Sequence, residues 1–530
     1  MKRLLLIVLA VMPFATAALL EKPIAVDGGQ VAGTPSPYWT DGVTVFRGIP
    51  FAAPPVGDLR WRPPQPVVAW QGVKEADKFS AACIQQPTAK DSDAWQEGLN
   101  TFSEDCLYLN IWTPAKTAGA NLPVMVFIHG GGNTRGAASE LQYDGNNLTK
   151  KGVVFVTFNY RMGAFGFLAH PDLTRESEHR ASGNYALQDQ IAALKWIQRN
   201  IAKFGGDPGN VMVFGHSAGA SNLAALTASP LAKGLFQRAL AQSGGLGNRT
   251  LLADAEKAGV RFAESLGAHS IAELRAKSAT EILNGPRTQN GPVVDGWVMP
   301  DDAYSIYAAG KQNDVPLIVG SVGDDGPGAA PPTTSVAAIK FAHDTYGDLA
   351  DEYMKVFPVS TDAQAAKASH DLRRDRMLSG ARTWVALQAK TGKSKAYWYL
   401  FDHAAPPPPG AIFSGHPASE KGSYHGGELV YIFDSLNLKD WPWTPVDHSL
   451  AGLMSTLWTN FVKTGNPNGP GMPAWSAYDP KQETLLYVTT AGKSQAPPYK
   501  AQLDFLEKAA AKQRETPAAA VPPVRARVGQ

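Results

Sequence analysis

Short, mostly apolar runs alternate along the chain with stretches whose apolar residues recur every three or four positions. The runs lie at 124–128, 153–158, 211–214, 239–242, 317–320 and 396–401, and continuous apolar character is expected of strands buried on both faces of a parallel sheet. Residues 184–204 and 450–461 carry the other periodicity, which predicts amphipathic helices. The alternation predicts an α/β fold, with a mostly parallel central sheet and helices on both faces.

The stretch Phe204–Gly219, FGGDPGNVMVFGHSAG, places a serine where a strand turns into a helix. The apolar run 211–214 comes before Ser217, and small residues that can open a helix come after it. Gly215 and Gly219 stand two residues to either side, where larger side chains would collide across a sharp turn. This spacing and context predict a nucleophile elbow, in which a strained turn holds the Ser217 hydroxyl clear of the backbone.

The two ends of the chain differ in composition from its centre. Residues 1–17, MKRLLLIVLAVMPFATA, place two positive charges before a short apolar core and end in small residues, as in a secretory signal peptide cleaved near Ala17. The protein is therefore expected to be secreted or periplasmic. Residues 507–530 are rich in Ala, Pro and Arg and lack core positions, so we expect a mobile tail. The length of the remaining chain, 18–506, allows several domains or a single α/β core with insertions.

Composition and charge mainly exclude other classes of protein. Hydrophobic residues make up 44% of the 530 residues and charged residues 18%, which is ordinary for a globular protein. The net charge of +2 and the lack of Lys/Arg runs give no indication of a nucleic-acid surface. No run after the signal peptide is long and apolar enough to suggest stable membrane insertion. No His/Cys/Asp cluster has metal-ligand spacing, and neither a metal nor an organic cofactor is expected.

Cys83 and Cys106 are the two cysteines of the chain. Two cysteines in an exported protein most often pair, so we expect a disulfide between them. In the chain-entropy model, closing such a loop stabilises the fold by roughly 3 kcal/mol.

Six sequence blocks along the chain have a further meaning when they are taken together. They are GIPFAAPPVGDLRWRPP near the start, EDCLYLNIWTP at Glu104–Pro114, NYRMGAFGFL at Asn159–Leu168, the serine stretch, HGGELVYIF at His425–Phe433 and WTNFVKTGNPN at Trp458–Asn468. These blocks resemble the type B carboxylesterase family of the α/β-hydrolase fold, which includes bacterial esterases, liver carboxylesterases and cholinesterases. The resemblance implies an α/β-hydrolase domain over 18–506, with helical insertions that form the substrate pocket.

The same resemblance implies a triad of serine, histidine and an acid around Ser217. The family's histidine begins its HGxE block, which corresponds to His425. Its acid is commonly a glutamate before a glycine, but the matching segment LIVGSVGDDGPG carries aspartates. We assign the acid to Asp325, with Asp324 as the alternative. Because aspartate is one methylene shorter, this loop must approach His425 more closely to hold its ring.

Other family positions correspond to groups that would assist the triad. The HGGG segment at 129–132 follows a buried strand, and glycines allow backbone N–H groups to approach a substrate closely. Ser243 matches a family serine near the catalytic histidine, and Glu428 is expected to anchor the His425 loop. The resemblance assigns the oxyanion hole to Gly131, Gly132 and Ala218.

The residues expected in the substrate pocket bear on the charge of the substrate. Cholinesterases of this family place an acidic residue directly before the serine, where this chain has His216. Trp95 lies near the position of the aromatic floor that they use in the disulfide loop. Without the carboxylate, a quaternary ammonium substrate is not expected. Arg135 follows the glycines by three residues, so we hypothesise that the enzyme accepts esters whose acyl part carries a carboxylate.

The sequence therefore predicts a secreted serine carboxylesterase that hydrolyses small-molecule esters through an acyl-enzyme. The alternative from another class is a non-catalytic adhesion or binding module, because this family also contains such proteins with a degraded triad. An interfacial lipase is a further alternative. Hydrolysis of amides uses the same triad and stays open.

Overall fold

The computed structural model describes residues 22–36, 42–87, 99, 101–247, 249–326, 330–408, 410, 412–413, 416–417 and 422–515. The signal peptide expected at 1–17 lies outside these ranges, and so do residues 516–530 of the expected tail. The described ranges contain every residue predicted to act at the active site except Trp95.

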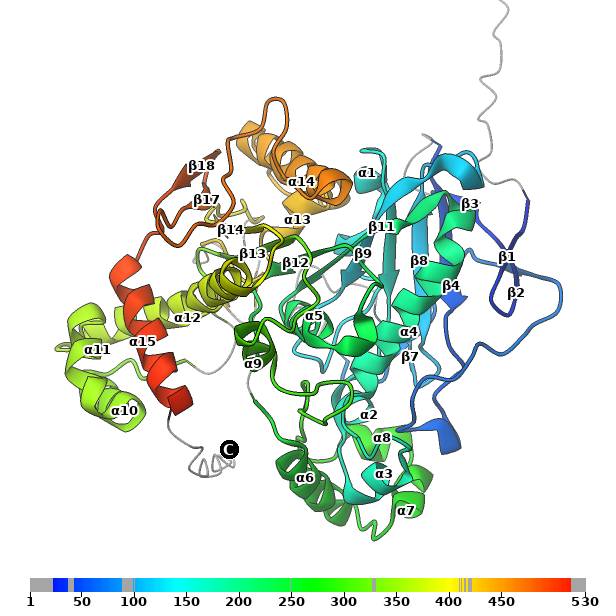
Figure 1. The fold of residues 1–530 in the computed structure, drawn as a ribbon, viewed down its shortest axis with the longest axis horizontal. Coiled ribbons are helices and arrows are strands. Elements are labelled where there is room, and N and C mark those ends of the chain that lie inside the picture. The colour runs from blue at the N-terminus through cyan, green and yellow to red at the C-terminus, as the bar shows by residue number, and fades with distance from the viewer. Residues whose placement is uncertain are drawn as a thin grey trace, which may run out of the picture.

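An 11-stranded sheet forms the centre of the molecule (Figure 1). Its strands lie in the order β18-β17-β14-β13-β12-β11-β9-β10-β8-β4-β3. In chain order they are β3 (Thr34–Pro35), β4 (Thr44–Pro50), β8 (Tyr108–Thr113), β9 (Leu122–Ile128), β10 (Val154–Phe158), β11 (Gly206–His216), β12 (Arg238–Gln242), β13 (Leu317–Val322), β14 (Ala396–Phe401), β17 (Leu485–Val488) and β18 (Gly492–Gln495). Neighbouring strands from β10 to β17 are parallel, and those at both edges are antiparallel. The predicted mostly parallel sheet is confirmed.

Alternate residues of the central strands face two separate hydrophobic cores. In β9, Val124, Val126 and Ile128 belong to one core. Met125 and Phe127 of the same strand belong to the other. A strand covered on both faces needs no polar side, so its sequence is a continuous apolar run rather than an alternating one. This is why the six apolar runs coincide with the strands from β9 to β14.

Helices cover both faces of the sheet (Figure 1). The helix predicted at 184–204 is α4, followed by a 3-10 turn at Ile201–Phe204 that ends at Gly205 with a φ of 82°. The periodic stretch 450–461 lies in α14, and its apolar residues are on the buried face of this helix. The first core is closed by α4 (Tyr185–Asn200), α5 (Ala218–Ala228), α9 (Ala303–Ala308) and α12 (Asp362–Thr391), and the second by α13 (Leu429–Ile432) and α14 (Pro445–Thr464).

The remaining helices lie mostly in two peripheral groups. The group at the bottom of Figure 1 contains α2 (Gly163–Phe167), α3 (Pro171–Glu176), α6 (Leu252–Ser265), α7 (Ile271–Ala276) and α8 (Ala279–Leu283). The group at its left contains α10 (Ser335–Tyr346), α11 (Ala350–Val356) and α15 (Lys500–Glu515). The short helix α1 (Asn146–Thr149) precedes β10.

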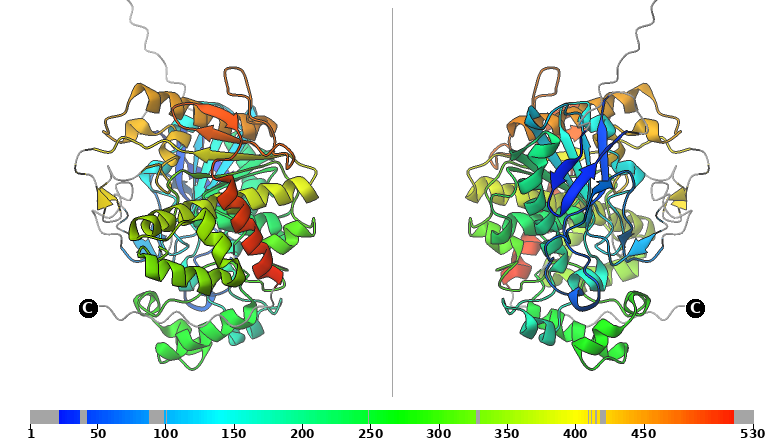
Figure 2. Two further views of the ribbon diagram at one scale, coloured as in Figure 1. Left: turned by 90° about the vertical axis from the view of Figure 1, so that its left-hand side faces the viewer. Right: turned by 90° about the vertical axis from the view of Figure 1, so that its right-hand side faces the viewer.

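The last helix corrects the predicted boundary of the C-terminal tail. We expected the tail to begin at 507, whereas α15 continues to Glu515 and Ala509 is buried in a core with α10 and α11. Figure 2 shows α15 lying against these helices. The ring of Phe505 packs edge-on against Tyr346 at 5.2 Å. The prediction is wrong because alanines can be core residues: small side chains allow two helices to pack closely.

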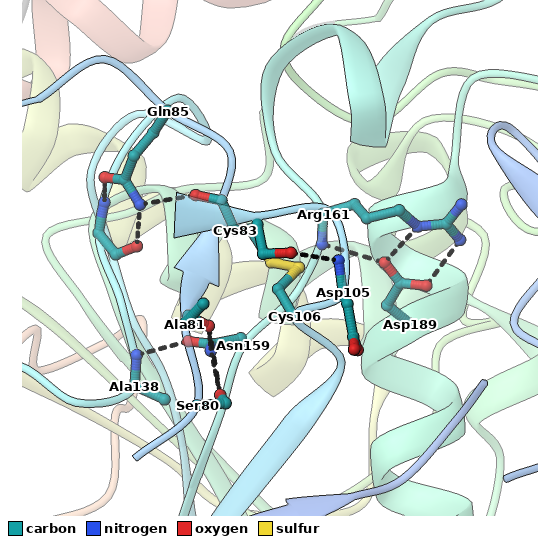
Figure 3. Close-up of a disulfide and its surroundings, with 12 residues drawn as sticks. Ser80, Ala81, Cys83, Gln85, Asp105, Cys106, Ala138, Asn159, Arg161 and Asp189 are labelled. Atoms are coloured by element: carbon teal, nitrogen blue, oxygen red, sulfur yellow. Dashed lines mark hydrogen bonds and ion pairs between the residues drawn. A yellow bond between two sulfur atoms is a disulfide. The ribbon is translucent and has the colours of Figure 1, made fainter. Parts of the chain in front are cut away.

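A disulfide joins Cys83 and Cys106, as predicted, across a sequence separation of 23 (Figure 3). Both cysteines are buried. Cys83 ends the short strand β6 (Ala82–Cys83), which pairs with β7 (Phe102–Ser103). The N-terminal segment forms its own small sheet from β1 (Ile24–Val26), β2 (Gly29–Ala32) and β5 (Val73–Glu75), and β15 (Ile412–Phe413) pairs with β16 (His416–Pro417).

Replacing both Cys83 and Cys106 with serine is expected to lower the free energy of unfolding by about 3 kcal/mol, because the unfolded chain gains the freedom of the opened loop. Urea unfolding followed by tryptophan fluorescence measures the change as a lower midpoint. Wild-type protein unfolded in the presence of a reductant is the matched control and should approach the midpoint of the variant. An unchanged midpoint in both experiments would contradict a stabilising role of the disulfide.

Candidate active site

Ser217 lies in the sharp turn between β11 and α5. Its backbone has a φ of 57° and a ψ of −122°, a conformation that costs a non-glycine residue about 1–3 kcal/mol. A Cβ on Gly215 would lie 2.6 Å from the backbone of Gly219, which is the predicted collision across the turn. A Cβ on Gly219 would instead lie 2.1 Å from the Ile128 carbonyl oxygen. The second glycine is therefore required by the neighbouring strand β9.

The structure brings Ser217, His425 and Asp325 into one hydrogen-bonded chain. Ser217 Oγ lies 2.8 Å from His425 Nε2, and His425 Nδ1 lies 2.7 Å from Asp325 Oδ1. A carboxylate only accepts hydrogen bonds, so Nδ1 carries the proton and Nε2 of the neutral ring accepts from the serine hydroxyl. A histidine held in this way can remove the hydroxyl proton as the serine attacks an electrophile.

Loops at one edge of the sheet supply the three side chains. Ser217 directly follows β11, Asp325 comes shortly after β13, and His425 lies in the loop that enters α13. Parallel strands end at the same edge, so residues distant in sequence meet there. The Asp325 side chain is buried, with the residue only 2% exposed, which keeps water from competing for the His425 ring.

The alternative acid, Asp324, faces a different partner. Its Oδ1 lies 2.5 Å from Nε2 of His370 on α12, and its Oδ2 accepts a hydrogen bond of 3.2 Å from the Gly422 backbone N–H. Asp324 therefore ties the acid loop to α12 and to the segment before His425. The structure places Asp325, rather than Asp324, against the histidine.

The charges around His425 favour its protonated form. Burial lowers the pKa of His425, but the Asp325 and Glu428 carboxylates raise it, and the net result is a pKa above the ordinary value of 6.5. The nearby positive charge of Arg135 acts in the opposite direction. An imidazolium formed during proton transfer is thus stabilised chiefly by Asp325.

The glycine loop, Gly130–Gly136, runs beside Ser217 after β9. A Cβ on Gly130 would lie 3.1 Å from the Ser217 Cβ. Gly131 and Gly132 have φ values of 99° and 64°, which favour glycine. Within the described part of the chain, their backbone N–H groups donate to no other residue. Ala218 is the first residue of α5, whose N–H has no partner inside the helix.

The residues predicted for the substrate pocket differ in their surroundings. His216 is buried, and its ring centroid lies 4.6 Å from that of His425. Burial, and then the charge of His425, hold the pKa of His216 well below 6.5, so the ring is neutral at neutral pH. Arg135 is exposed within electrostatic reach of His425. Trp95 lies outside the described residues.

Ser243 and Glu428, the expected supporting residues, are both buried. Burial raises the pKa of Glu428 to about 7, and the nearby Asp325 adds to this effect, although a backbone N–H opposes it. Gln242 Nε2 lies 3.5 Å from Glu428 Oε1. Ser243 follows β12 with a φ of 52°, and its Oγ has no hydrogen-bond partner within the described ranges. The Glu428 carboxylate raises the pKa of His425 when it is ionised, whereas the Ser243 hydroxyl makes no hydrogen bond to the histidine.

A small, mostly apolar pocket with a volume of about 40 Å³ lies beside α5 and was not predicted. Ser221, one helical turn beyond Ser217, forms part of its wall. The other walls come from three separate segments between α5 and α9, including Leu246, Val293 and Met299. None of these segments carries a chemical motif, so the sequence offered no signal for this pocket.

Two other kinds of site are absent from the residues described by the structure. No three His, Cys, Asp or Glu side chains are grouped so that they could hold a metal ion. No helix in the same ranges combines the length and apolar character needed to cross a membrane.

Comparison with known proteins agrees with this geometry. A family model described as the carboxylesterase family matches residues 21–506. The fumonisin B1 esterase of Sphingopyxis macrogoltabida is 35% identical over 477 residues, which cover 86% of this chain and 85% of that protein. The human cocaine esterase is 34% identical over 481 residues, with coverages of 84% and 83%.

Solved structures show the same relationship. A structure titled pNB esterase matches with a TM-score of 0.77 and 30% identity, covering 92% of this chain and 99% of that one. A carboxylesterase of Geobacillus stearothermophilus matches with a TM-score of 0.76 and 29% identity, covering 91% and 99%. The chain therefore belongs to the carboxylesterase family, and it is a serine hydrolase of carboxylic esters with the α/β-hydrolase fold.

Proposed function

We propose that this enzyme hydrolyses esters through an acyl-enzyme on Ser217, with His425 as general base and Asp325 as the acid of the triad. The hydrogen-bonded chain from Ser217 Oγ through His425 to Asp325 carries the proposal. His425 Nε2 accepts the hydroxyl proton as Oγ adds to the ester carbonyl carbon. The tetrahedral intermediate then expels the alcohol, which takes the proton from His425. Water repeats the sequence, releases the acid and restores Ser217.

The oxyanion of each tetrahedral intermediate is proposed to bind the backbone N–H groups of Gly131, Gly132 and Ala218. These groups lie on the two segments that border Ser217, the glycine loop and the start of α5. Donors that are fixed before the reaction stabilise the developing charge without reorganising. The N-terminus of α5 adds a favourable dipole at the same place.

We further propose that the enzyme favours esters whose acyl group carries a carboxylate. Arg135 supports this because it is exposed at the end of the glycine loop, within electrostatic reach of His425. His216 supports it because its ring is neutral, so no negative charge stands directly before the nucleophile. A carboxylate near Arg135 would gain an ion pair only partly screened by water.

Export from the cytoplasm, to the periplasm or the medium, is proposed from the sequence at 1–17. Its charged start, short apolar core and small-residue end have the order of a signal peptide. The Cys83–Cys106 disulfide supports the proposal, because such bonds form and persist mainly in oxidising compartments. Mass spectrometry of the mature protein would find its first residue near 18 if this is right.

Two soluble chromogenic esters of matched size, one neutral and one with a free carboxylate on its acyl group, test the proposed substrate preference. Wild-type enzyme is expected to show the higher kcat/KM for the anionic ester. Arg135→Ala should raise KM for that ester about fivefold and leave KM for the neutral ester unchanged, since a partly exposed ion pair contributes about 1 kcal/mol.

The same variant has a second expected effect. The charge of Arg135 lowers the pKa of His425, so its removal should move the acid limb of the pH–kcat/KM profile for the neutral ester to higher pH. Arg261→Ala, which removes an exposed arginine from α6, is the matched control and should change neither measurement. An equal rise in KM for both esters would contradict the proposed preference.

A further inference from the structure

The sequence of the glycine loop does not by itself favour a single conformation. Gly131, Gly132 and Gly136 have φ values of 99°, 64° and 108°, and Asn133 has a φ of 56°. Glycine loses more conformational freedom on ordering than any other residue. A loop that must present N–H groups within a few tenths of an ångström therefore needs anchors from elsewhere in the fold. Besides the Gly163 backbone N–H, which donates to the Asn133 carbonyl at 2.6 Å, the described residues supply four such anchors, and three of these are side-chain amides from other segments.

The first anchor joins the middle of the loop to the helix of the nucleophile. The Asn222 side chain donates to Asn133 Oδ1 at 2.8 Å, and Asn133 Nδ2 lies 3.3 Å from Asn222 Oδ1. Both residues are buried, and buried amides that satisfy each other hold a defined geometry. Because Asn222 is on α5, which begins directly after Ser217, the loop is fixed relative to the nucleophile itself.

The second anchor comes from Asn290, in the segment between α8 and α9. Its Nδ2 donates to the Gly132 carbonyl oxygen at 3.0 Å. Its own backbone carbonyl accepts from Asn133 Nδ2, also at 3.0 Å. Asn290 therefore holds the peptide that follows Gly132, next to a proposed oxyanion donor. Tyr160, the third anchor, donates from its hydroxyl to the His129 carbonyl at 2.9 Å, just before the loop.

The fourth anchor holds the far end of the loop. The Gly136 backbone N–H donates to Gln85 Oε1 at 2.8 Å, and Gln85 Nε2 donates to the Gly136 carbonyl at 2.9 Å (Figure 3). Gln85 is only 2% exposed and also donates to the Cys83 carbonyl at 3.1 Å. The disulfide segment thus fixes the exit of the loop, while Asn222 and Asn290 fix its centre.

We propose that Asn222, Asn290 and Gln85 are positioning residues for the oxyanion hole. They hold the glycine loop in the conformation that presents its backbone N–H groups. The inference rests on the proposed function of Gly131 and Gly132 as oxyanion donors. None of the three amides needs to touch the substrate. Their effect on the rate arises because a donor displaced by about 1 Å loses most of its transition-state stabilisation.

Asn290→Ala provides the cleanest test. The Asn290 side chain is exposed, so its removal creates no cavity, and its backbone carbonyl still accepts from Asn133. Among the described residues, the substitution removes only the hydrogen bond to the Gly132 carbonyl. Asn284→Ala is the matched control, because Asn284 is an exposed asparagine of the same connecting region whose side chain contacts Gln86 rather than the glycine loop.

The measurements are kcat and KM for a neutral chromogenic ester, the inhibition constant of an arylboronic acid, and the fraction of sites labelled by a fluorophosphonate. In Asn290→Ala, kcat should fall about tenfold with KM unchanged, and the inhibition constant of the tetrahedral boronate should rise by the same factor. The labelled fraction should stay at the wild-type level. Asn290→Asp, which keeps the shape but replaces the donor with a negatively charged acceptor, should lower kcat at least as much as the alanine variant.

Other results would overturn the inference. If Asn290→Ala lowers only the labelled fraction, Asn290 acts on folding alone. If kcat and boronate binding are unchanged, or fall equally in Asn284→Ala, the amide does not position the loop. Failure of the underlying proposal would look different, because a wild-type enzyme that lacks the nucleophile or the oxyanion donors would not be labelled at Ser217 or would not bind the boronate tightly.

Discussion

Replacing Ser217 with alanine is expected to lower kcat about a million-fold, the scale seen when a hydrolase loses a member of its triad. Ser217 Oγ, just after the end of β11, lies 2.8 Å from His425 Nε2. Among the described residues, it is the only group that hydrogen-bonds to this nitrogen. Without it, no acyl-enzyme can form and water must attack the ester directly. The remaining rate would come from the oxyanion donors and substrate binding, which alone accelerate hydrolysis over water.

Hydrolysis of a soluble chromogenic ester at high protein concentration measures the residual rate. A fluorophosphonate should label wild-type enzyme once, at Ser217, and should not label the variant. Ser449→Ala is the matched control, since Ser449 is exposed on α14 and, among the described residues, its hydroxyl donates only to the Pro445 carbonyl. A Ser217→Ala protein with more than about 1% of the wild-type rate would contradict the proposed nucleophile.

The features that the sequence predicted well depend on local physical rules. The continuous apolar runs marked β9 to β14 because strands covered on both faces carry no polar side. The turn at Ser217 was recognisable because Gly215 lies too close to the Gly219 backbone for any side chain. Such rules involve residues that are close together in the chain, so the features they produce can be predicted from the sequence.

The choice between Asp324 and Asp325 could not be made in the same way. Both aspartates belong to the same short segment after β13, and the sequence gives them equal chemistry. The difference arises because His370, on α12, binds Asp324 and leaves Asp325 facing His425. That contact joins residues 46 positions apart, so only the folded chain shows it.

The anchors of the glycine loop were missed for the same reason. Gln85 and Asn290 contact the loop across sequence separations of 51 and 158 residues. An amide side chain in a loop is common, and nothing in the sequence marks these two. The surroundings of His216 and Arg135 were likewise unpredictable, because burial and exposure depend on how distant segments cover each residue.

Asp325→Asn is expected to lower kcat about ten-thousand-fold, as removal of the charge from a triad acid does elsewhere. An amide at this position can donate a hydrogen bond to His425 Nδ1 and thereby favour the tautomer that carries its proton on Nε2. That tautomer cannot accept the Ser217 proton. The amide also carries no charge to stabilise the imidazolium. The effect should appear in kcat, while KM changes little, because Asp325 is buried behind the histidine.

The pH profile separates this explanation from a general loss of structure. Burial lowers the pKa of His425, and Asp325 is the first of the carboxylates that raise it. Without the Asp325 charge, burial prevails, so the histidine stays neutral down to a lower pH. The acid limb of kcat/KM should therefore move to lower pH in Asp325→Asn although the maximal rate falls.

Asp324→Asn is the matched control. It weakens the contact with His370 and should lower kcat less than tenfold, with the acid limb at the same pH as in the wild type. If Asp324→Asn instead gave the larger loss and the shifted limb, the triad acid would be Asp324.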